Sequence, residues 1–195
     1  MKSPGSLLIC VFCGASSGDS LIYDKAGYNL GRNLGIRGHS LLYGAGGVGV
    51  MGAVARGAAD EGANIIGIIP TFLREREMLD SIPRQEILLT KSLAQRKSLM
   101  LSHADAFVAL PGGYGTLDET LEVISTSVLG VDRKPVVLVN IDGFWDPFIK
   151  LVDELEGRGF VPAERFFTIV DDPDEAIQYV ESALGLSGLM MGTSP

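Results

Sequence analysis

Short aliphatic runs alternate along this chain with segments of helical periodicity. Runs of this kind, apolar at nearly every position, are typical of strands that are buried on both faces of a parallel sheet. The strand-like runs are Leu7–Phe12, Ser40–Tyr43, Asn64–Ile69, Ala106–Leu110 and Pro135–Val139. The segments between and after them that have helical spacing lie near Ile22–Arg37, Val50–Glu61, Leu93–Ser102, Leu117–Leu129 and Asp146–Glu156.

This alternation predicts an α/β fold with a doubly wound, mostly parallel, Rossmann-like sheet that is covered by helices on both sides. Glu86–Leu89 and Phe167–Val170 are expected to add edge strands, and Pro173–Leu184 a final helix. A chain of 195 residues with 46% hydrophobic content can bury one sizeable core, so we expect a single domain over residues 1–195. Its ordered core should span about residues 7–184, with a loose tail from 185 to 195.

The charge balance is acidic, with 16 Lys+Arg against 24 Asp+Glu and a net charge of -8. A chain of this charge is not expected to bind nucleic acid or an anionic membrane nonspecifically. Met1–Gly5 and the short apolar run after it do not fit a signal peptide or a membrane span. The sequence therefore predicts a cytoplasmic protein.

Cys10 and Cys13 form a C-x-x-C spacing at the end of a strand-like run. Residues three apart in a strand point to opposite faces, so we expect two buried, small apolar side chains rather than a redox or metal pair. His39 and His103 have no partners at metal-ligand spacing. Neither a metal nor a cofactor is predicted.

Three junctions between a strand and a helix contain glycines, and ligands of open α/β sheets bind beyond the carboxyl ends of the strands. The first junction is Gly14–Gly18. Its small residues and its two hydroxyls suit a binding pocket, and they suit an ordinary loop with a helix cap equally well.

The second junction, Tyr43–Gly52, reads YGAGGVGVMG and contains a G-x-G-x-x-G pattern. A dinucleotide site would place an acid at the end of the following strand, but that strand ends in Pro70-Thr71. The glycines are therefore interpreted as positions of close packing or of close approach by a nucleotide, and not as an NAD(P) fingerprint.

The third junction is PGGYGTLDE, Pro111–Glu119, and it resembles a phosphate-binding turn. Its glycines leave backbone amides open to a ligand, and the positive end of the following helix attracts an anion. Thr116 is expected to cap that helix, whose inward stripe should be Leu117, Leu121, Ile124 and Val128. No lysine follows the glycines as a Walker A loop would require.

Charged residues near this turn suggest chemistry as well as binding. Asp118 and Glu119 fall in the expected first turn of the helix, where acids either complement the helix dipole or, beside a bound phosphate, serve acid–base chemistry or ribose binding. Arg96 and Lys97 lie near the start of another helix, in QRKSLM. Cations are unfavourable there unless they serve an anionic ligand.

Together, QRKSLM, PGGYGTLDE, VFCGASSG and YGAGGVGVMG resemble the LONELY GUY family from about Leu7 to Phe167. The resemblance implies a Rossmann-like dimer that hydrolyses cytokinin riboside 5'-monophosphates, and often AMP, to a free base and ribose 5-phosphate. Arg96 and Glu119 are then the catalytic pair. The substrate-binding residues that the resemblance implies are Gly14, Ser16, Gly44, Gly46, Glu77, Lys97, Gly112, Gly113, Tyr114, Gly115 and Thr116.

The chain departs from the family pattern at Leu93–Gln95, Ala45, Thr126 and Val128. These positions bear on the choice of base more than on the phosphate and ribose chemistry, so the sequence leaves the physiological base open. A related fold with a similar glycine turn occurs in molybdenum cofactor carriers. A non-catalytic carrier or sensor of a phosphorylated ligand is therefore the alternative function.

Overall fold

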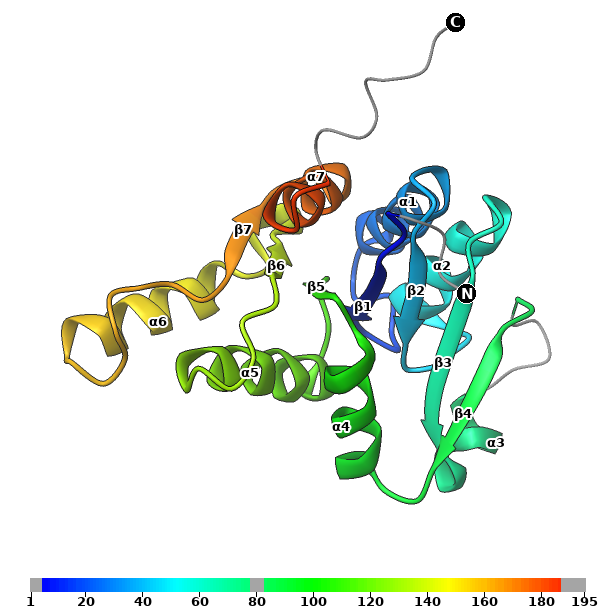
Figure 1. Ribbon diagram of the computed structural model, residues 1–195, viewed down its shortest axis with the longest axis horizontal. Coiled ribbons are helices and arrows are strands. Elements are labelled where there is room, and N and C mark those ends of the chain that lie inside the picture. Colours follow the sequence, from blue (N-terminus) through cyan, green and yellow to red (C-terminus); the bar gives the residue numbers. More distant parts are fainter. Residues whose placement is uncertain (1–4, 78–82, 187–195) are drawn as a thin grey trace, which may run out of the picture.

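The computed structural model describes residues 5–77 and 83–186, which form one seven-stranded parallel sheet in the order β4-β3-β2-β1-β5-β6-β7 (Figure 1). The strands are β1 Leu8–Phe12, β2 Ser40–Tyr43, β3 Ile65–Pro70, β4 Glu86–Thr90, β5 Ala106–Ala109, β6 Val136–Val139 and β7 Thr168–Val170. The predicted edge strands, β4 and β7, lie at the two edges of the sheet.

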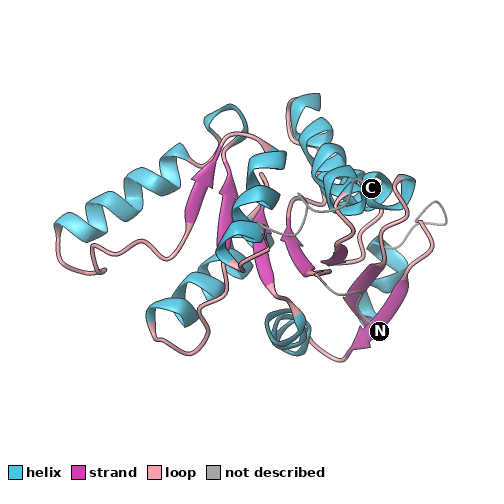
Figure 2. Ribbon diagram, turned by 45° about the horizontal axis from the view of Figure 1, so that its top comes forward, coloured by secondary structure: helices cyan, strands magenta, loops and turns pink. Residues whose placement is uncertain are grey.

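Helices cover both sides of the sheet, which Figure 2 shows as cyan ribbons on either side of the strands. The α-helices are α1 Leu21–Ile36, α2 Gly49–Asp60, α3 Arg74–Glu77, α4 Leu93–His103, α5 Tyr114–Val128, α6 Asp146–Gly157 and α7 Pro173–Ala183. Two short 3₁₀ helices, Thr71–Leu73 and Ile141–Gly143, complete the described elements.

Alternate residues of β1 divide the core into two layers. Ile9 and Val11 pack with residues of α1, α2 and α7, whereas Cys10 and Phe12 pack with residues of α4, α5 and the segment around Trp145. The prediction of a doubly wound, parallel Rossmann-like sheet is therefore confirmed. The near-continuous apolar runs made this outcome predictable, because a strand covered on both sides has no solvent face to keep polar.

The cysteines follow the same alternation. Cys10 belongs to one core layer and Cys13 to the other, and both are free and buried. Burial raises the pKa of each thiol. The two side chains therefore do not meet as a redox pair, as the strand periodicity predicted.

Three helices begin at side-chain caps, in which Ser20, Ser92 and Asp172 accept hydrogen bonds from backbone N–H groups of the first turn. The two helices that begin at glycine junctions, α2 and α5, have no side-chain cap. The first N–H groups of an α-helix have no partner within the helix. The amides at the start of α2 and α5 are therefore left to the surroundings of the junctions.

Helix α5 begins three residues earlier than expected. Its N-cap is Gly113, so Thr116 is the third helical residue and not the cap, and Asp118 and Glu119 lie in the second turn. Sequence periodicity placed the start at the first apolar residue, Leu117. The glycine-rich turn itself takes helical geometry, which glycine neither favours nor forbids.

The expected inward stripe of α5 was partly wrong: Leu117 and Ile124 pack against the core, whereas Leu121 and Val128 do not. The residues of α5 that are buried are Thr116, Glu119, Thr120, Val123 and Ser127. Leu121 and Val128 are exposed, and Leu117 and Ile124 are partly buried. The helix places small and polar residues against the sheet and turns its larger aliphatic residues toward α6, a tertiary choice that periodicity alone does not determine.

No helix in residues 5–77 or 83–186 is long and apolar enough to cross a membrane. Residues 187–195, most of the expected loose tail, lie outside the described part of the chain.

Candidate active site

The three glycine junctions meet at the carboxyl ends of β1, β2 and β5. The backbone N–H of Gly14 donates to the carbonyl oxygen of Pro111 over 3.1 Å, and the N–H of Met51 donates to the carbonyl oxygen of Gly14 over 3.0 Å. Strand order reverses between β1 and β5, which is where open α/β sheets bind ligands. The junctions therefore assemble at the expected place.

A crevice of about 390 Å³ opens at this point of the sheet. It is lined by Ser16, Ser17, Gly18, Asp19, Tyr23, Val50, Pro111, Gly112 and Phe144. Tyr23 and Phe144 form an edge-to-face aromatic pair whose ring centroids are 6.1 Å apart. Sequence reasoning missed both aromatic residues, because only the strand order brings the segment after β6 beside α1.

Arg96 of α4 and Glu119 of α5 meet beside the second junction. Nη2 of Arg96 donates to Oε1 of Glu119 over 3.2 Å, and the two residues are only 7% and 9% exposed. Nε of Arg96 is buried and has no hydrogen-bond partner among the described residues. The guanidinium therefore holds the carboxylate with one nitrogen and retains an unused donor.

The carboxyl group of Glu119 titrates near neutral pH. Burial raises its pKa from 4.5 to about 7; Arg96 opposes the shift, and the nearby charge of Asp118 adds to it. A carboxyl group with such a pKa can accept or release a proton at physiological pH, as acid–base catalysis requires. Perturbed values of this kind concentrate at functional sites.

Lys97 lies beside Arg96 in sequence but binds the outer face of α5. Its Nζ is 2.8 Å from Oδ2 of Asp118 and 2.8 Å from Oε2 of Glu122. The hydrogen bond to Asp118, followed by the one to Glu122, raises the pKa of the amine. Two carboxylates therefore neutralise Lys97, whose assignment to the anion site stays a prediction.

The start of α5 is open to a ligand. A Cβ added to Gly113 or Gly115 would have no other atom within 4 Å, whereas one at Gly112 would lie 2.7 Å from the backbone nitrogen of Gly14. The hydroxyl of the buried Thr116 lies beneath Gly112, and Tyr114 points into solvent. Backbone amides, and not these two side chains, form the open face of the turn.

The sequence around this site matches a known protein family. Residues 51–180 match the model of a family described as "Possible lysine decarboxylase". This chain belongs to that family. The matched range contains Arg96, the glycine turn and Glu119, but it begins after the first junction and near the end of the second.

Curated relatives in the family are similar over most of the chain. A rice (Oryza sativa subsp. japonica) protein, "Cytokinin riboside 5'-monophosphate phosphoribohydrolase LOG", is 43% identical over 85% of this chain and 68% of its own length. LOG2 of Arabidopsis thaliana, described by the same activity, is 44% identical over 85% of this chain and 78% of its own. The resemblance to the LONELY GUY family is confirmed.

Solved structures share the fold at lower identity. The molybdenum cofactor binding protein of Rippkaea orientalis has a TM-score of 0.69 and 23% identity, over 92% of this chain and 98% of its own. The molybdenum cofactor carrier protein of Chlamydomonas reinhardtii has a TM-score of 0.70 and 22% identity, over 92% of this chain and 99% of its own. At this identity the likeness establishes the fold alone.

Most of the site residues that the family resemblance predicted lie around the three junctions. Gly112 lies between Gly14 and Thr116, and Ser16 lines the crevice. The side chain of Glu77, at the end of α3, lies outside the described part of the structure. Among the described residues, no group of three or more His, Cys, Asp or Glu is arranged to hold a metal.

Met51 is a contact that sequence reasoning missed. Its sulfur accepts the backbone N–H of Gly46 over 3.1 Å, and its own N–H is bonded to the first junction. This one residue therefore ties the second junction to the first. The only signal in the sequence was an apolar residue just inside a helix that opens with glycines.

The raised pKa of Glu119 predicts a pH-dependent stability. The carboxyl group of Glu119 binds its proton more tightly in the folded protein than in the unfolded chain. Its contribution to the free energy of unfolding is therefore full below pH 4.5 and is lost as the pH rises to about 7. We expect this loss to be on the order of 3 kcal/mol and to be absent from Glu119→Gln. Urea unfolding of both proteins at several pH values measures the difference; parallel curves would contradict the prediction.

Proposed function

We propose that this protein hydrolyses the N-glycosidic bond of a nucleoside 5'-monophosphate, a cytokinin riboside 5'-monophosphate or AMP, to a free base and ribose 5-phosphate. One observation carries the proposal: the buried Arg96–Glu119 pair lies beside glycine junctions whose helix amides are open to an anion. The activity printed for the rice and Arabidopsis relatives supports the same reaction.

The 5'-phosphate is assigned to the start of α5. The uncapped amides from Gly113 to Thr116 and the positive end of the helix suit a phosphate dianion. The absence of side chains at Gly113 and Gly115 leaves room for the phosphate oxygens to approach the backbone. With the phosphate held there, the ribose lies toward Glu119, on the next turn of the same helix.

We place the carboxylate of Glu119 beside C1' of the ribose, the carbon at which the bond to the base breaks. As the bond between C1' and the base nitrogen breaks, the ribose gains oxocarbenium character, which an adjacent carboxylate stabilises. The ionised carboxylate accepts a proton from the attacking water while the water oxygen bonds to C1'. The bonding electron pair leaves with the base, which takes up a proton from solvent, and Glu119 then returns its proton to solvent. The unused donor of Arg96 is available to orient a ribose or phosphate oxygen.

Lysine decarboxylation, suggested by the family description, does not fit these residues. That reaction uses pyridoxal phosphate held through the Schiff base of a lysine whose amine is readily deprotonated. The lysine beside the catalytic pair, Lys97, is bonded to Asp118 and Glu122, and these bonds raise its pKa instead. Pyridoxal phosphate therefore has no part in the proposed reaction.

The proposed function is tested by incubating the purified protein with AMP or isopentenyladenosine 5'-monophosphate and following the free base by chromatography. We expect base release from at least one nucleotide, and little release from adenosine, which lacks the phosphate that α5 would hold. The ratio between the two nucleotides reports the base preference that the altered Leu93–Gln95 segment leaves open. Tight nucleotide binding without any base release would instead support a carrier.

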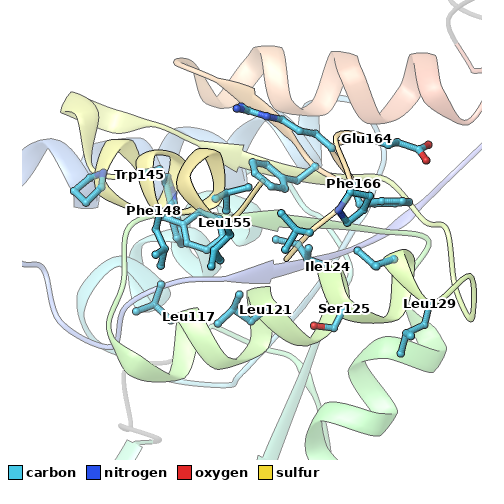
Figure 3. Close-up of a pocket in the computed structure, with 18 of the residues that line it drawn as sticks. Leu117, Leu121, Ile124, Ser125, Leu129, Trp145, Phe148, Leu155, Glu164 and Phe166 are labelled. Atoms are coloured by element: carbon cyan, nitrogen blue, oxygen red, sulfur yellow. The ribbon is translucent and has the colours of Figure 1, made fainter. Parts of the chain in front are cut away.

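The assembly is proposed from the surface of α5 and α6. An apolar groove of about 790 Å³ lies between these helices, away from the catalytic pair (Figure 3). The groove is lined by Leu117, Leu121, Ile124, Leu129, Trp145, Phe148, Leu151, Val152, Leu155 and Phe166, among others. No residue of α6 is classed as buried, although the helix carries an aliphatic and aromatic face.

We propose that a second copy of this chain covers the α5–α6 groove, giving a homodimer. Leu121 and Leu151, on its two helices, are 48% and 53% exposed, which a monomer would leave in water at a cost. The double variant Leu121→Glu/Leu151→Glu is expected to sediment as a monomer. The matched change Leu21→Glu, on the distant α1, should leave the dimer intact. A monomeric wild-type protein, or a dimeric double variant, would refute this assembly.

A cytoplasmic location is proposed on the state of the thiols. Cys10 and Cys13 are free in the described structure and lie in separate core layers. Free cysteines of this kind are typical of proteins in reducing compartments. Fractionation of the native host, with the protein detected by antibody, checks this assignment.

A further inference from the structure

Gly44, the first residue after β2, has a side-chain position that is already filled. A Cβ added to Gly44 would overlap Nη2 of Arg96 and would lie 3.2 Å from its Cζ. The φ angle of Gly44 is not in the left-handed region, unlike that of Gly49. The backbone conformation therefore does not demand glycine at this position; instead, the end of the Arg96 side chain occupies the space that a side chain would need.

The overlapping nitrogen is the one that holds Glu119. Nη2 of Arg96 is 3.2 Å from Oε1 of Glu119, so a displacement of about an ångström would remove this hydrogen bond. The sulfur of Met51 lies 3.2 Å from the same added Cβ, and Arg96 is buried. An added methyl group would therefore have to displace this buried guanidinium, the group that donates to Glu119.

The other glycines of the junctions have different surroundings. An added Cβ at Gly113 or Gly115 would enter open space, and one at Gly46 would lie 2.6 Å from the sulfur of Met51, near the end of a flexible side chain. Among the junction glycines Gly14, Gly44, Gly46, Gly49, Gly52, Gly112, Gly113 and Gly115, Gly44 is the one whose added Cβ would meet Arg96. Its role is therefore distinct from phosphate approach.

We propose that Gly44 is a positioning residue for catalysis. Because glycine has no side chain, it leaves a space, here called the seat, that the Arg96 guanidinium occupies and that fixes this group against Glu119. The inference rests on the proposed function for its catalytic consequence, whereas the seat itself is a packing relation. It adds a steric role to the expectation that Gly44 serves the ligand directly, and it explains why a small residue follows β2 at a point without turn strain.

Gly44→Ala tests the proposal through kinetics. We expect kcat to fall about 100-fold, because an ångström-scale misplacement of a catalytic group has effects of this size. KM should change little, since the amides at the start of α5 are not disturbed. The matched control is Gly157→Ala, at an exposed position of α6 where an added Cβ meets nothing within 4 Å. A kcat for Gly44→Ala within threefold of wild type would overturn the proposal.

A double-mutant cycle with Arg96→Lys separates the seat from other roles of Gly44. Lysine lacks the Nη2 atom that an added methyl would overlap, so Gly44→Ala should cost less than about threefold in that background. A loss that is equally large in both backgrounds would show that the glycine acts through something other than Arg96, and would refute the seat.

The same cycle can be measured through stability, which needs neither turnover nor a known substrate. Gly44→Ala is expected to destabilise the wild-type protein in urea, and to destabilise Arg96→Ala much less, because the overlap is then gone. Equal destabilisation in both backgrounds counts against the seat. If the wild-type protein releases no base, the proposed function fails, while this measurement still decides the role of Gly44.

Discussion

Replacement of Glu119 by glutamine is expected to lower the rate of base release roughly 10³-fold, the size of a lost acid–base group. The amide keeps the shape of the side chain and can still accept a hydrogen bond from Arg96, so the packing of this buried position is preserved. It can neither carry the negative charge that faces the oxocarbenium ion nor take a proton from water. Single-turnover assays with AMP or isopentenyladenosine 5'-monophosphate measure the effect.

Nucleotide affinity should stay within about threefold of the wild-type value in Glu119→Gln, because the phosphate is assigned to backbone amides. The control is Asp118→Asn, one position away, whose side chain is 62% exposed and pairs with Lys97. Surface pairs of this kind contribute little, so its turnover should be within about threefold of wild type. Equal losses in the two variants, or undiminished turnover in Glu119→Gln, would remove Glu119 from the mechanism.

Replacement of Arg96 by alanine is expected to lower kcat/KM roughly 10²-fold to 10³-fold. The guanidinium donates to Glu119 and lowers the pKa of its carboxyl group against the effect of burial. Without that cation the carboxyl holds its proton to higher pH. The rising limb of the pH–rate profile, where the ionised form is needed, should therefore move to higher pH in the variant.

Arg96→Lys separates charge from geometry in this second experiment. Lysine restores a cation beside Glu119 but lacks the planar fork of donors, so the pH profile should return toward wild type while kcat stays reduced. Profiles of kcat/KM for the three proteins measure both effects. A loss of rate in Arg96→Ala without any change in the pH profile would contradict a direct electrostatic link between the two residues.

Most of the fold could be predicted from the sequence, because buried parallel strands and the helices between them leave strong periodic signals. The strand Ser40–Tyr43 was placed at its observed limits, and both edge strands were found. The orientation of α5 could not be predicted in the same way. Its aliphatic residues follow a helical stripe, but no local pattern specifies whether that stripe faces the sheet or the groove beside α6.

The site was predicted in part, and for a similar reason. Glycine turns and the charged residues Arg96 and Glu119 have local signatures, and the structure joins that pair directly. Tyr23, Met51 and Phe144 have no such signature, since they enter the site only when strand order brings their segments together. That the Arg96 guanidinium occupies the space beside Gly44 can likewise be seen only in a structure with side chains.

Helix α5 presents Glu119 toward the sheet and Leu121 toward the groove. This one helix therefore borders the proposed reaction centre on one face and the proposed contact between copies on the other. Thermodynamic linkage makes any coupling between the two faces reciprocal: a nucleotide that changes self-association by some factor has its own affinity changed by self-association by the same factor. A dependence of the proposed monomer–dimer equilibrium on AMP concentration would then report occupancy of the site without any observation of catalysis.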